Sequence, residues 1–266
     1  MSDIGPNSLA SLDGEIMPAS EATIPVTDDG LIRGDGAFEV VRVYDGVPYA
    51  FDAHLARLQR TGDNIRLPVD LEAVRADSHR LLAEAGTGED AQLLRIMLTR
   101  GGRRILLTER MPHMPAEARL MSVTYSPTRV LDSAKTLSYA ANMLAGRLAV
   151  EAGYDEALLV TPHGRVLEAP TSSIFYVIGG ELFTPPLDEH ILASITRALV
   201  LEVSGGSERP VTLEELKSAD EVFLASTVRE VQPVVAVDEH EFTGPRPVSE
   251  RTATAAAERI RTELRS

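Results

Sequence analysis

The stretch Ser126–Arg129 breaks the regular pattern of the chain and constrains its fold more than any other feature. It carries Pro127 and follows a run typical of a strand, which indicates a linker. On both sides of it, short alternating apolar runs are mixed with stretches of helical periodicity. The sequence therefore predicts an α+β protein with a first domain over residues 1–125, a linker over 126–132 and a second domain over 133–266.

The first half opens with a polar segment and then shows a hairpin. Residues 1–15 are small and polar, and we expect a loose arm there. Phe38–Tyr44 and Val47–Phe51 are typical of two strands, and the pair Asp45-Gly46 between them is typical of a two-residue turn. We further expect a helix that Asp52 caps and that runs to about residue 64, and a second helix over 70–85. Strands are expected near 92–100 and 119–125.

The second half is richer in short strands. Turns at His163-Gly164 and Gly179-Gly180 separate several of them. The periodicity predicts helices over residues 140–152, from about 194 and over 248–265, and strands at 156–160, 165–167, 173–178, 181–183, 221–225 and 234–237.

The composition excludes several classes of protein. A net charge of −14 would repel nucleic acids and anionic membranes, so we expect neither as a partner. The absence of cysteine excludes disulfides, thiolate metal sites and a cysteine nucleophile, and we expect no metal site. The N-terminus lacks the pattern of a leader, and no apolar run reaches the roughly 18 residues of a membrane span. We therefore expect a soluble cytoplasmic protein.

Lysine is almost absent from the chain, which draws attention to the two that remain. They account for two of the 26 basic residues, and the other 24 are arginines. A lysine amine can lose its proton and condense with an aldehyde, whereas arginine stays protonated. Lys217 lies among acidic residues on a predicted exposed helix, which favours a surface charge. Lys135 lies in a stretch of small residues just before a predicted helix and is the candidate for a Schiff base.

A Schiff-base cofactor of the pyridoxal phosphate kind also needs a phosphate site and an acid beside its ring nitrogen. Ser194–Arg197 begins a predicted helix, whose free amides suit a phosphate, although an ordinary serine cap has the same pattern. The turn at Ser226-Thr227 offers hydroxyl groups, and Arg57 lies on the inner face of a helix, where a surface arginine is the alternative. Glu168 ends a predicted strand and would keep the ring nitrogen protonated, unless it is simply a solvated acid.

Taken in order, these residues resemble the class IV (fold-type IV) pyridoxal phosphate-dependent aminotransferases. This group includes D-amino-acid aminotransferases, branched-chain aminotransferases and aminodeoxychorismate lyases. The resemblance runs from about residue 14 to 237 and rests on the segments Asp29–Arg42, Phe51–Leu58, Tyr154–Val160, Gly164–Glu168, Leu182–Pro186 and Ile195–Arg197.

The resemblance implies a fold, a cofactor and a set of roles. The fold would combine a smaller N-terminal α/β domain with a larger C-terminal pseudo-barrel domain, with pyridoxal 5′-phosphate in the cleft between them. Lys135 would form the Schiff base and shuttle protons, and Glu168 would contact the pyridine nitrogen. The phosphate would be held by Arg57, Ile195, Thr196 and Thr227. Members of the family are usually homodimers whose pockets draw on both subunits.

Several positions depart from the family pattern and leave the subfamily open. Ala169 replaces the usual glycine after the ring glutamate, and Ser173 replaces an asparagine. Branched-chain enzymes carry a tyrosine five residues after the lysine, whereas this chain has Ala140 there and Tyr139 one place earlier. Many lyases carry an arginine at the position of Tyr139.

The reaction we favour is transamination between an amino acid and a 2-oxo acid. The segment Gly34–Gly46 looks most like D-amino-acid enzymes, so D-amino acids are the leading substrates. Aminodeoxychorismate lyase, branched-chain L-amino-acid transaminase and a non-catalytic relative that binds the cofactor remain alternatives. We expect the substrate to contact Arg33, Arg103 and Arg104, which would bind its carboxylate, together with Phe38 and Thr171.

Overall fold

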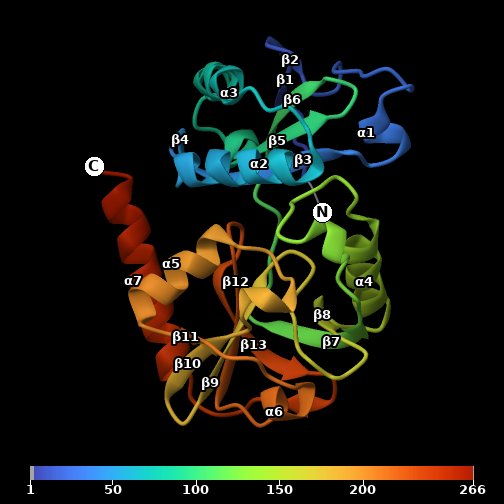
Figure 1. The fold of residues 1–266 in the computed structure, drawn as a ribbon. Coiled ribbons are helices and arrows are strands. Elements are labelled where there is room, and N and C mark those ends of the chain that lie inside the picture. Colours follow the sequence, from blue (N-terminus) through green and yellow to red (C-terminus); the bar gives the residue numbers. More distant parts are fainter. Residues whose placement is uncertain (1–2, 266) are drawn as a thin grey trace. The chain divides into compact units, whose positions relative to one another are not determined.

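The computed structural model describes residues 3–265, which form two compact units with two separate sheets. Unit 1 comprises Met1–His113 and Ala134–Tyr139, and unit 2 comprises Met114–Ser133 and Ala140–Ser266. The α+β class predicted from the sequence is confirmed, since each unit combines a sheet with helices (Figure 1). Among the described residues, no helix is long and apolar enough to cross a membrane.

Unit 1 contains a six-stranded sheet with the order β2-β1-β6-β5-β3-β4, in which neighbouring strands pair antiparallel. Its strands are β1 Leu9–Leu12, β2 Glu15–Pro18, β3 Gly36–Tyr44, β4 Val47–Pro48, β5 Leu93–Thr99 and β6 Arg104–Glu109. Its helices are α1 Asp29–Ile32, α2 Phe51–Ile65, α3 Leu71–Ala85 and the short η1 Glu89–Ala91. The predicted hairpin is present, with positive φ at both Asp45 and Gly46.

The helices α2 and α3 pack on one face of this sheet (Figure 1). Leu55 and Leu58 of α2 and Leu81 of α3 meet the inward side chains of β3 and β5 in one buried cluster. Along β3 the inward positions are 37, 39, 41 and 43, because side chains alternate across a strand. The charged residue Glu39 therefore lies in a row that is otherwise apolar.

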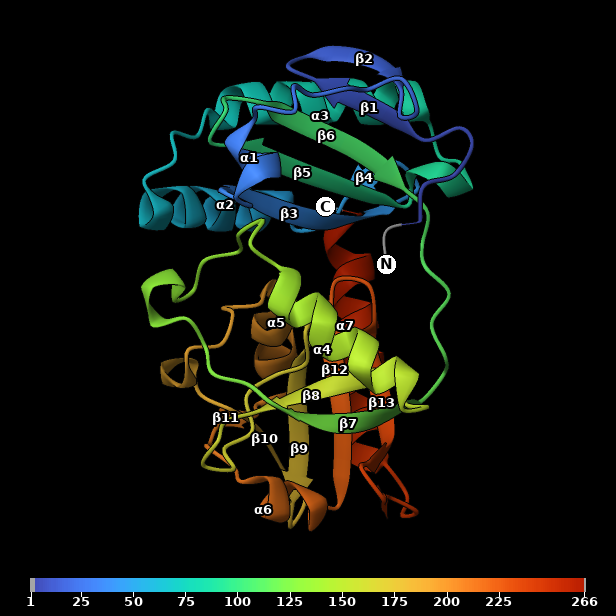
Figure 2. The same ribbon diagram turned by 90° about the vertical axis from the view of Figure 1, so that its right-hand side faces the viewer.

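Unit 2 contains the second sheet, in the order β11-β10-β9-β12-β13-β7-β8, with β14 paired to β13. Figure 2 shows β7 and β8 side by side, and they pair in parallel. The strands are β7 Ala118–Thr124, β8 Glu156–Val160, β9 Ser173–Ile178, β10 Glu181–Thr184, β11 Ser207–Glu208, β12 Glu221–Ser226, β13 Glu230–Val237 and β14 His240–Glu241. The helices are η2 Arg129–Leu131, α4 Ala140–Glu151, η3 Leu187–Glu189, α5 Ile195–Ser204, α6 Leu213–Lys217 and α7 Pro247–Glu263.

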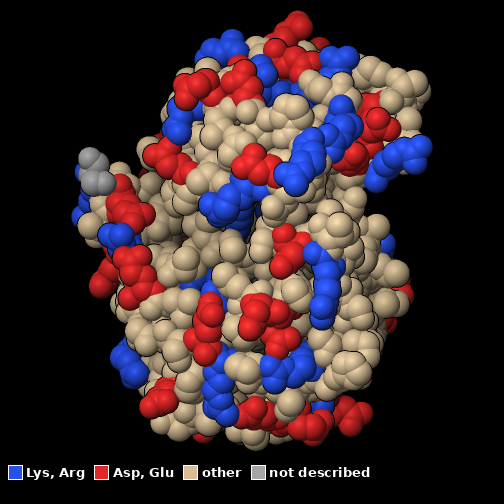
Figure 3. Space-filling model, viewed as in Figure 1, with Lys and Arg blue, Asp and Glu red and all other residues tan. Residues whose placement is uncertain are grey.

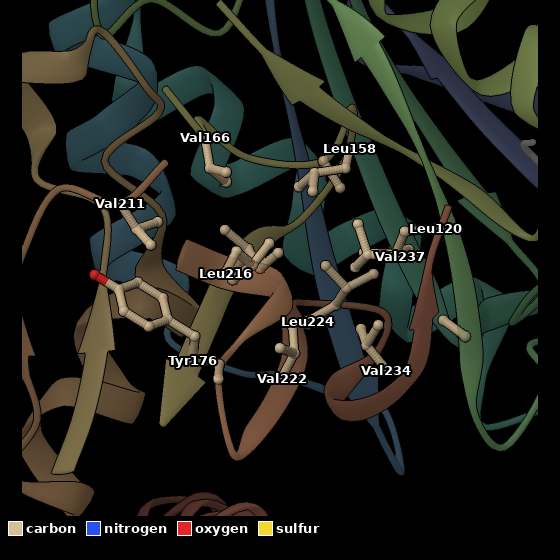
Figure 4. Packing of buried hydrophobic residues seen from close by; sticks show 14 of the residues in the cluster. Leu120, Leu158, Val166, Tyr176, Val211, Leu216, Val222, Leu224, Val234 and Val237 are labelled. Carbon is tan, nitrogen blue, oxygen red and sulfur yellow. The ribbon is translucent and has the colours of Figure 1, made fainter. Parts of the chain in front are cut away.

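The core of unit 2 is built from branched side chains and one buried tyrosine. Figure 4 shows Tyr176, Leu158, Leu216 and Leu224 pointing into a common cluster. The hydroxyl of Tyr176 reaches the edge of this core and donates a hydrogen bond to the carbonyl of Arg209 at 2.6 Å. This satisfies the polar end of an otherwise apolar contact.

Three details differ from the elements expected from the sequence. The predicted loose arm is wrong for Leu9–Leu12, because this segment is strand β1 and hydrogen-bonds to both β2 and β6. The strand β7 lies within the predicted first domain but pairs with β8 and β13 of unit 2. Residues 165–167 were expected to form a strand but make only isolated bridges. Arg165 bridges to Thr212, and Val166 bridges to Val160.

Gly36 offers a direct test of how β3 is packed. A Cβ at this position would collide with the Leu98 carbonyl oxygen and with the Leu137 side chain. We expect Gly36→Ala to lower the free energy of unfolding by about 1–3 kcal/mol, as overpacked sites do. Denaturant titration would measure the loss, with Gly88→Ala as the control because nothing lies within 4 Å of its Cβ position. Equal stability of the two variants would contradict this account of the packing.

Candidate active site

The backbone of Lys135 is fixed by pairing with β3 in unit 1. The amide of Phe38 donates to the carbonyl of Lys135 at 3.0 Å, and the amide of Leu137 donates to the carbonyl of Gly36 at 2.9 Å. The amide of Lys135 donates to Thr61 Oγ1 on α2 at 3.1 Å. Residues 135–137 thus extend the sheet beyond β3, although they come almost a hundred residues later in the chain.

Two aromatic rings enclose the amine of Lys135. Its Nζ lies 4.3 Å from the ring centroid of Phe38 and 5.6 Å from that of Tyr139. The two rings meet edge to face at 5.3 Å and 78°. Both distances to the amine are within the range of a cation–π interaction. The structure therefore brings Phe38 next to Lys135 and adds Tyr139 to the candidate residues.

Arg57 is held on α2 by a buried carboxylate of β3. Its Nε and Nη2 each donate to Glu39 at 2.7 Å, one to each carboxylate oxygen. His54, one turn earlier on the same helix face, places Nδ1 2.8 Å from Glu39 Oε2. The three residues are 4%, 0% and 1% exposed, respectively. Such a two-pronged contact fixes the plane of the guanidinium group as well as its position.

The protonation states of this cluster follow from its burial. Burial opposes ionisation of Glu39, but Arg57 and His54 outweigh it and lower the pKa of Glu39 to about 2. Burial lowers the pKa of His54 below its usual value, although Glu39 acts in the opposite direction. At neutral pH, His54 is therefore neutral and Glu39 ionised. Because an ionised carboxylate can only accept, His54 carries its proton on Nδ1.

Glu168 and the start of α5 are brought together in unit 2. Glu168 Oε1 accepts a hydrogen bond from the amide of Leu192 at 3.2 Å. The amide of Ser194 in turn donates to the carbonyl of Leu192 at 2.8 Å. The acid proposed for the ring nitrogen and the helix start proposed for the phosphate are thus tied to the same short loop.

The first turn of α5 has the character of an anion site. Ser194 is its N-cap, and its hydroxyl accepts from the amide of Arg197 at 3.2 Å. The preceding amides belong to Ile195 and Thr196, the two residues expected at the phosphate. The amides at the start of a ten-residue helix also carry the positive end of its dipole.

The turn between β12 and β13 contains Thr227. In this turn the hydroxyl of Ser226 accepts from the amide of Arg229 at 3.2 Å. The helix α5 packs over β12, with Val200, Phe223 and Ala225 in one buried cluster. Thr227 therefore follows directly on a strand that α5 covers.

Tyr125 is a neighbour of Glu168 that sequence reasoning did not single out. Burial, and then the negative charge of Glu168, raise the pKa of Tyr125 above its usual value. Its hydroxyl lies 3.5 Å from the side-chain oxygen of Asn142, whose amide nitrogen donates to the Pro170 carbonyl at 3.2 Å. The only sequence signal was the position of Tyr125 at the end of a predicted strand.

The three arginines expected at the substrate carboxylate are engaged differently. Arg103 pairs with Asp13 at 2.6 Å, and Arg104 pairs with Asp77 at 2.6 Å. Arg33 is the most exposed of the three, with a side chain 74% accessible and 3.6 Å from Asp29. The role of these residues in substrate binding stays a prediction, as does that of Thr171, whose hydroxyl lies 3.5 Å from Glu156.

Lys217 has a structural partner. Its amine lies 3.0 Å from Asp238, which also accepts from the amide and the hydroxyl of Ser122. The chain therefore has one lysine in an ion pair with a carboxylate and one whose amine lies against two aromatic rings.

These groups suit a cofactor that has an aldehyde, a basic ring nitrogen and a phosphate. The amine of Lys135 belongs to unit 1, and the carboxylate of Glu168 and the amides at the start of α5 belong to unit 2. Among residues 3–265, no group of three or more His, Cys, Asp or Glu side chains is arranged to hold a metal ion.

The family of the chain follows from comparison with known proteins. The sequence profile of amino-transferase class IV matches residues 36–237, which include Lys135, Glu168 and the start of α5. The chain belongs to the class IV aminotransferases. Enzymes of this class bind pyridoxal 5′-phosphate, which is therefore the cofactor of this protein.

Two relatives of this class IV protein carry different names. It is 33% identical over 253 residues to a putative branched-chain-amino-acid aminotransferase of Methanocaldococcus jannaschii, covering 85% of this chain and 87% of the relative. It is 28% identical over 275 residues to a D-alanine aminotransferase of Bacillus licheniformis, covering 94% and 96%. These matches agree on the family and carry two different substrate names.

Solved structures agree with this family assignment. A fold IV transaminase from Curtobacterium pusillum matches with a TM-score of 0.83 and 26% identity, covering 98% of this chain and 100% of that one. A PLP-bound hypothetical aminotransferase from Mycobacterium tuberculosis matches with a TM-score of 0.85 and 25% identity, covering 97% and 100%.

The neutral state of His54 predicts a pH dependence of stability. Unfolding raises the pKa of His54 back towards about 6.5, so the unfolded chain binds more protons below that pH and stability falls as the pH drops. The loss approaches about 1.4 kcal/mol per pH unit for one group. We expect His54→Gln to show a shallower decline than the parent between about pH 6.5 and 5.

Denaturant titrations at several pH values would measure this difference. The window lies above the range in which Glu39 titrates, because the pKa of Glu39 changes between 4.5 in the unfolded chain and about 2 in the folded one. His163→Gln, at an exposed turn, is the control. Parallel curves for the parent and His54→Gln would show that folding does not lower the pKa of His54.

Proposed function

We propose that this protein transfers the amino group of an amino acid to a 2-oxo acid, with D-amino acids as the preferred donors and Lys135 as the residue that binds the cofactor covalently. The observation that carries the proposal is the setting of Lys135, whose amine lies against Phe38 and Tyr139 at the start of β3.

When bound, pyridoxal 5′-phosphate supplies an aldehyde carbon that condenses with amines and a ring that accepts electrons. Lys135 contributes its Nζ, which once free can take a proton from the substrate and return it. The backbone pairing with β3 and the two aromatic rings hold this side chain in place. The same rings cover part of its surface and thereby exclude water from it.

The other proposed cofactor residues bind and orient. Glu168 accepts the Leu192 amide on one oxygen, and its carboxylate would hold a proton at the ring nitrogen. Ile195 and Thr196 would donate backbone amides to the phosphate, with Thr227 as a hydroxyl donor. Arg57 would add a charged donor whose direction is set by Glu39.

D-amino acids are proposed as donors because Gly34–Gly46 looks most like the D-amino-acid enzymes and several relatives are named D-alanine aminotransferases. Branched-chain amino acids are the second candidate. They are favoured by the 33% identity to the Methanocaldococcus jannaschii protein, which is named a putative branched-chain-amino-acid aminotransferase.

We further propose a homodimer with a shared active site in the cytoplasm. One surface of α4 supports the dimer, because Leu144 and Leu148 lie one turn apart on this helix and are 50% and 41% exposed. Exposed apolar side chains gathered in this way are common at interfaces between protein chains.

The absence of cysteine supports a reducing compartment. Acidic and basic groups are interspersed on the face drawn in Figure 3, which gives no single-sign patch for a polyanion.

The lysine assignment predicts where the cofactor becomes attached. Reduction of the loaded protein with borohydride should fix pyridoxal phosphate on Lys135, because this amine is the one in the proposed site. Peptide mass spectrometry would locate the label. Lys135→Ala should lose both the label and turnover, whereas Lys217→Ala should keep both, since Lys217 serves an ion pair with Asp238. A label on Lys217, or none on the parent, would refute the assignment.

The substrate proposal predicts the effect of single arginine replacements. If Arg33, Arg103 or Arg104 binds the substrate carboxylate, its replacement by Ala should cost about 1.5–3 kcal/mol in kcat/KM for amino acids. Amines without a carboxylate should be affected little. Turnover of a panel of D- and L-amino acids with pyruvate or 2-oxoglutarate would measure this and establish the handedness.

Asp13→Asn provides a matched control for Arg103. It breaks the same ion pair but leaves the arginine in place, so it separates loss of structure from loss of a substrate contact. Unchanged discrimination between amino acids and amines in all three arginine variants would place the carboxylate site elsewhere.

A further inference from the structure

Unit 2 buries an arginine–glutamate pair to which the functional site described above gives no role. Arg229 Nη2 lies 2.8 Å from Glu156 Oε2, and the two side chains are 7% and 10% exposed. Burial lowers the pKa of Arg229, and the carboxylate of Glu156 opposes this change. The attraction within such a pair only roughly offsets the cost of removing both charges from water. Net stability is therefore a weak explanation for the pair, and the geometry that it imposes is a better one.

Further hydrogen bonds show what the pair holds together. Glu156 begins β8, and its Oε2 also accepts from the hydroxyl of Thr171 at 3.5 Å. Arg229 lies in the turn between β12 and β13, and its Nη1 donates to the side-chain oxygen of Gln232 on β13. One carboxylate therefore contacts two turns, one through Thr171 and the other through Arg229.

Both turns carry residues of the proposed site. Thr171 comes three residues after Glu168, and Arg229 comes two residues after Thr227. We propose that Glu156 and Arg229 are positioning residues that hold the turn of Thr227 against the turn of Thr171 within unit 2, and thereby set the affinity for the phosphate group of the cofactor. This inference rests on the proposed role of Thr227 at the phosphate.

The planar shape of the guanidinium group matters for this role. Arg229 uses two different nitrogens, one for Glu156 and one for Gln232, and so its orientation is fixed as well as its position. A lysine at this position would keep the positive charge but offer a single donor group. Arg229→Lys should therefore restore only part of what Arg229→Met loses.

The test compares binding of pyridoxal phosphate with binding of pyridoxal, which lacks the phosphate. Equilibrium dialysis would give both dissociation constants for the parent and for Arg229→Met, Arg229→Lys and Thr227→Ala. We expect Arg229→Met to weaken pyridoxal phosphate about tenfold or more, the effect of losing one well-aligned charge-assisted contact, and to leave pyridoxal nearly unchanged. A change in stability alone would shift both ligands together.

Two further variants separate positioning from misfolding. Glu156→Gln/Arg229→Met leaves no unpaired buried charge, and we expect it to bind pyridoxal phosphate as weakly as Arg229→Met. Arg209→Met breaks the pair between Arg209 and Glu215, a more exposed ion pair of the same unit, and should leave both affinities unchanged.

The outcomes distinguish this inference from the proposed function. Phosphate preference is the ratio of the dissociation constants of pyridoxal and pyridoxal phosphate. The inference alone would be overturned if Thr227→Ala lost this preference while Arg229→Met and the double variant kept the value of the parent. Parental preference in Thr227→Ala would contradict the proposed phosphate role of Thr227, and the inference would fall with it. The inference and the proposed role of Thr227 would both be supported if Thr227→Ala, Arg229→Met and the double variant all showed a reduced preference. Arg229→Lys should then lie between the parent and Arg229→Met.

Discussion

The site in unit 1 depends on the pairing of residues 135–137 with the start of β3. Because side chains alternate along a strand, this pairing places Lys135 beside Phe38 on one face of the sheet, while Glu39 points to the other face beneath α2. One face of β3 thus carries Phe38, which contacts the amine of Lys135, and the other face carries Glu39, which orients Arg57. A slip of one residue in the register would exchange the two faces and separate both contacts.

Each unit places a carboxylate inside its sheet and matches it with an arginine. Glu39 with Arg57 in unit 1 and Glu156 with Arg229 in unit 2 are both almost fully buried. In each case the arginine comes from a neighbouring helix or turn that carries residues of the proposed site. Buried ion pairs of this kind add little net stability but tolerate few alternative geometries. They suit a protein that must present donors in fixed directions to a small charged cofactor.

Much of the fold was predictable where local signals dominate. The Asp45-Gly46 hairpin and the helix from Asp70 to Gly86 have the expected ends, because turn and cap residues act over a few positions. Pairing over long distances was not predictable: β1 gains its strand character from β6, and β7 joins β8 and β13. Likewise the resemblance to class IV aminotransferases named Lys135 and Glu168, whereas nothing in the sequence showed that Arg103 and Arg104 pair with Asp13 and Asp77.

The division of the chain between the units has a consequence for its synthesis. The backbone passes from unit 1 to unit 2 after His113, returns for Ala134–Tyr139 and leaves again. On the ribosome, the sheet of unit 1 can form early, but the strand segment that carries Lys135 reaches β3 only after β7 has been made. One edge of β7 pairs with β8, and its other edge can pair only after β13 has been synthesised. Lys135 can therefore join a sheet that has already formed, while much of unit 2 has still to be synthesised.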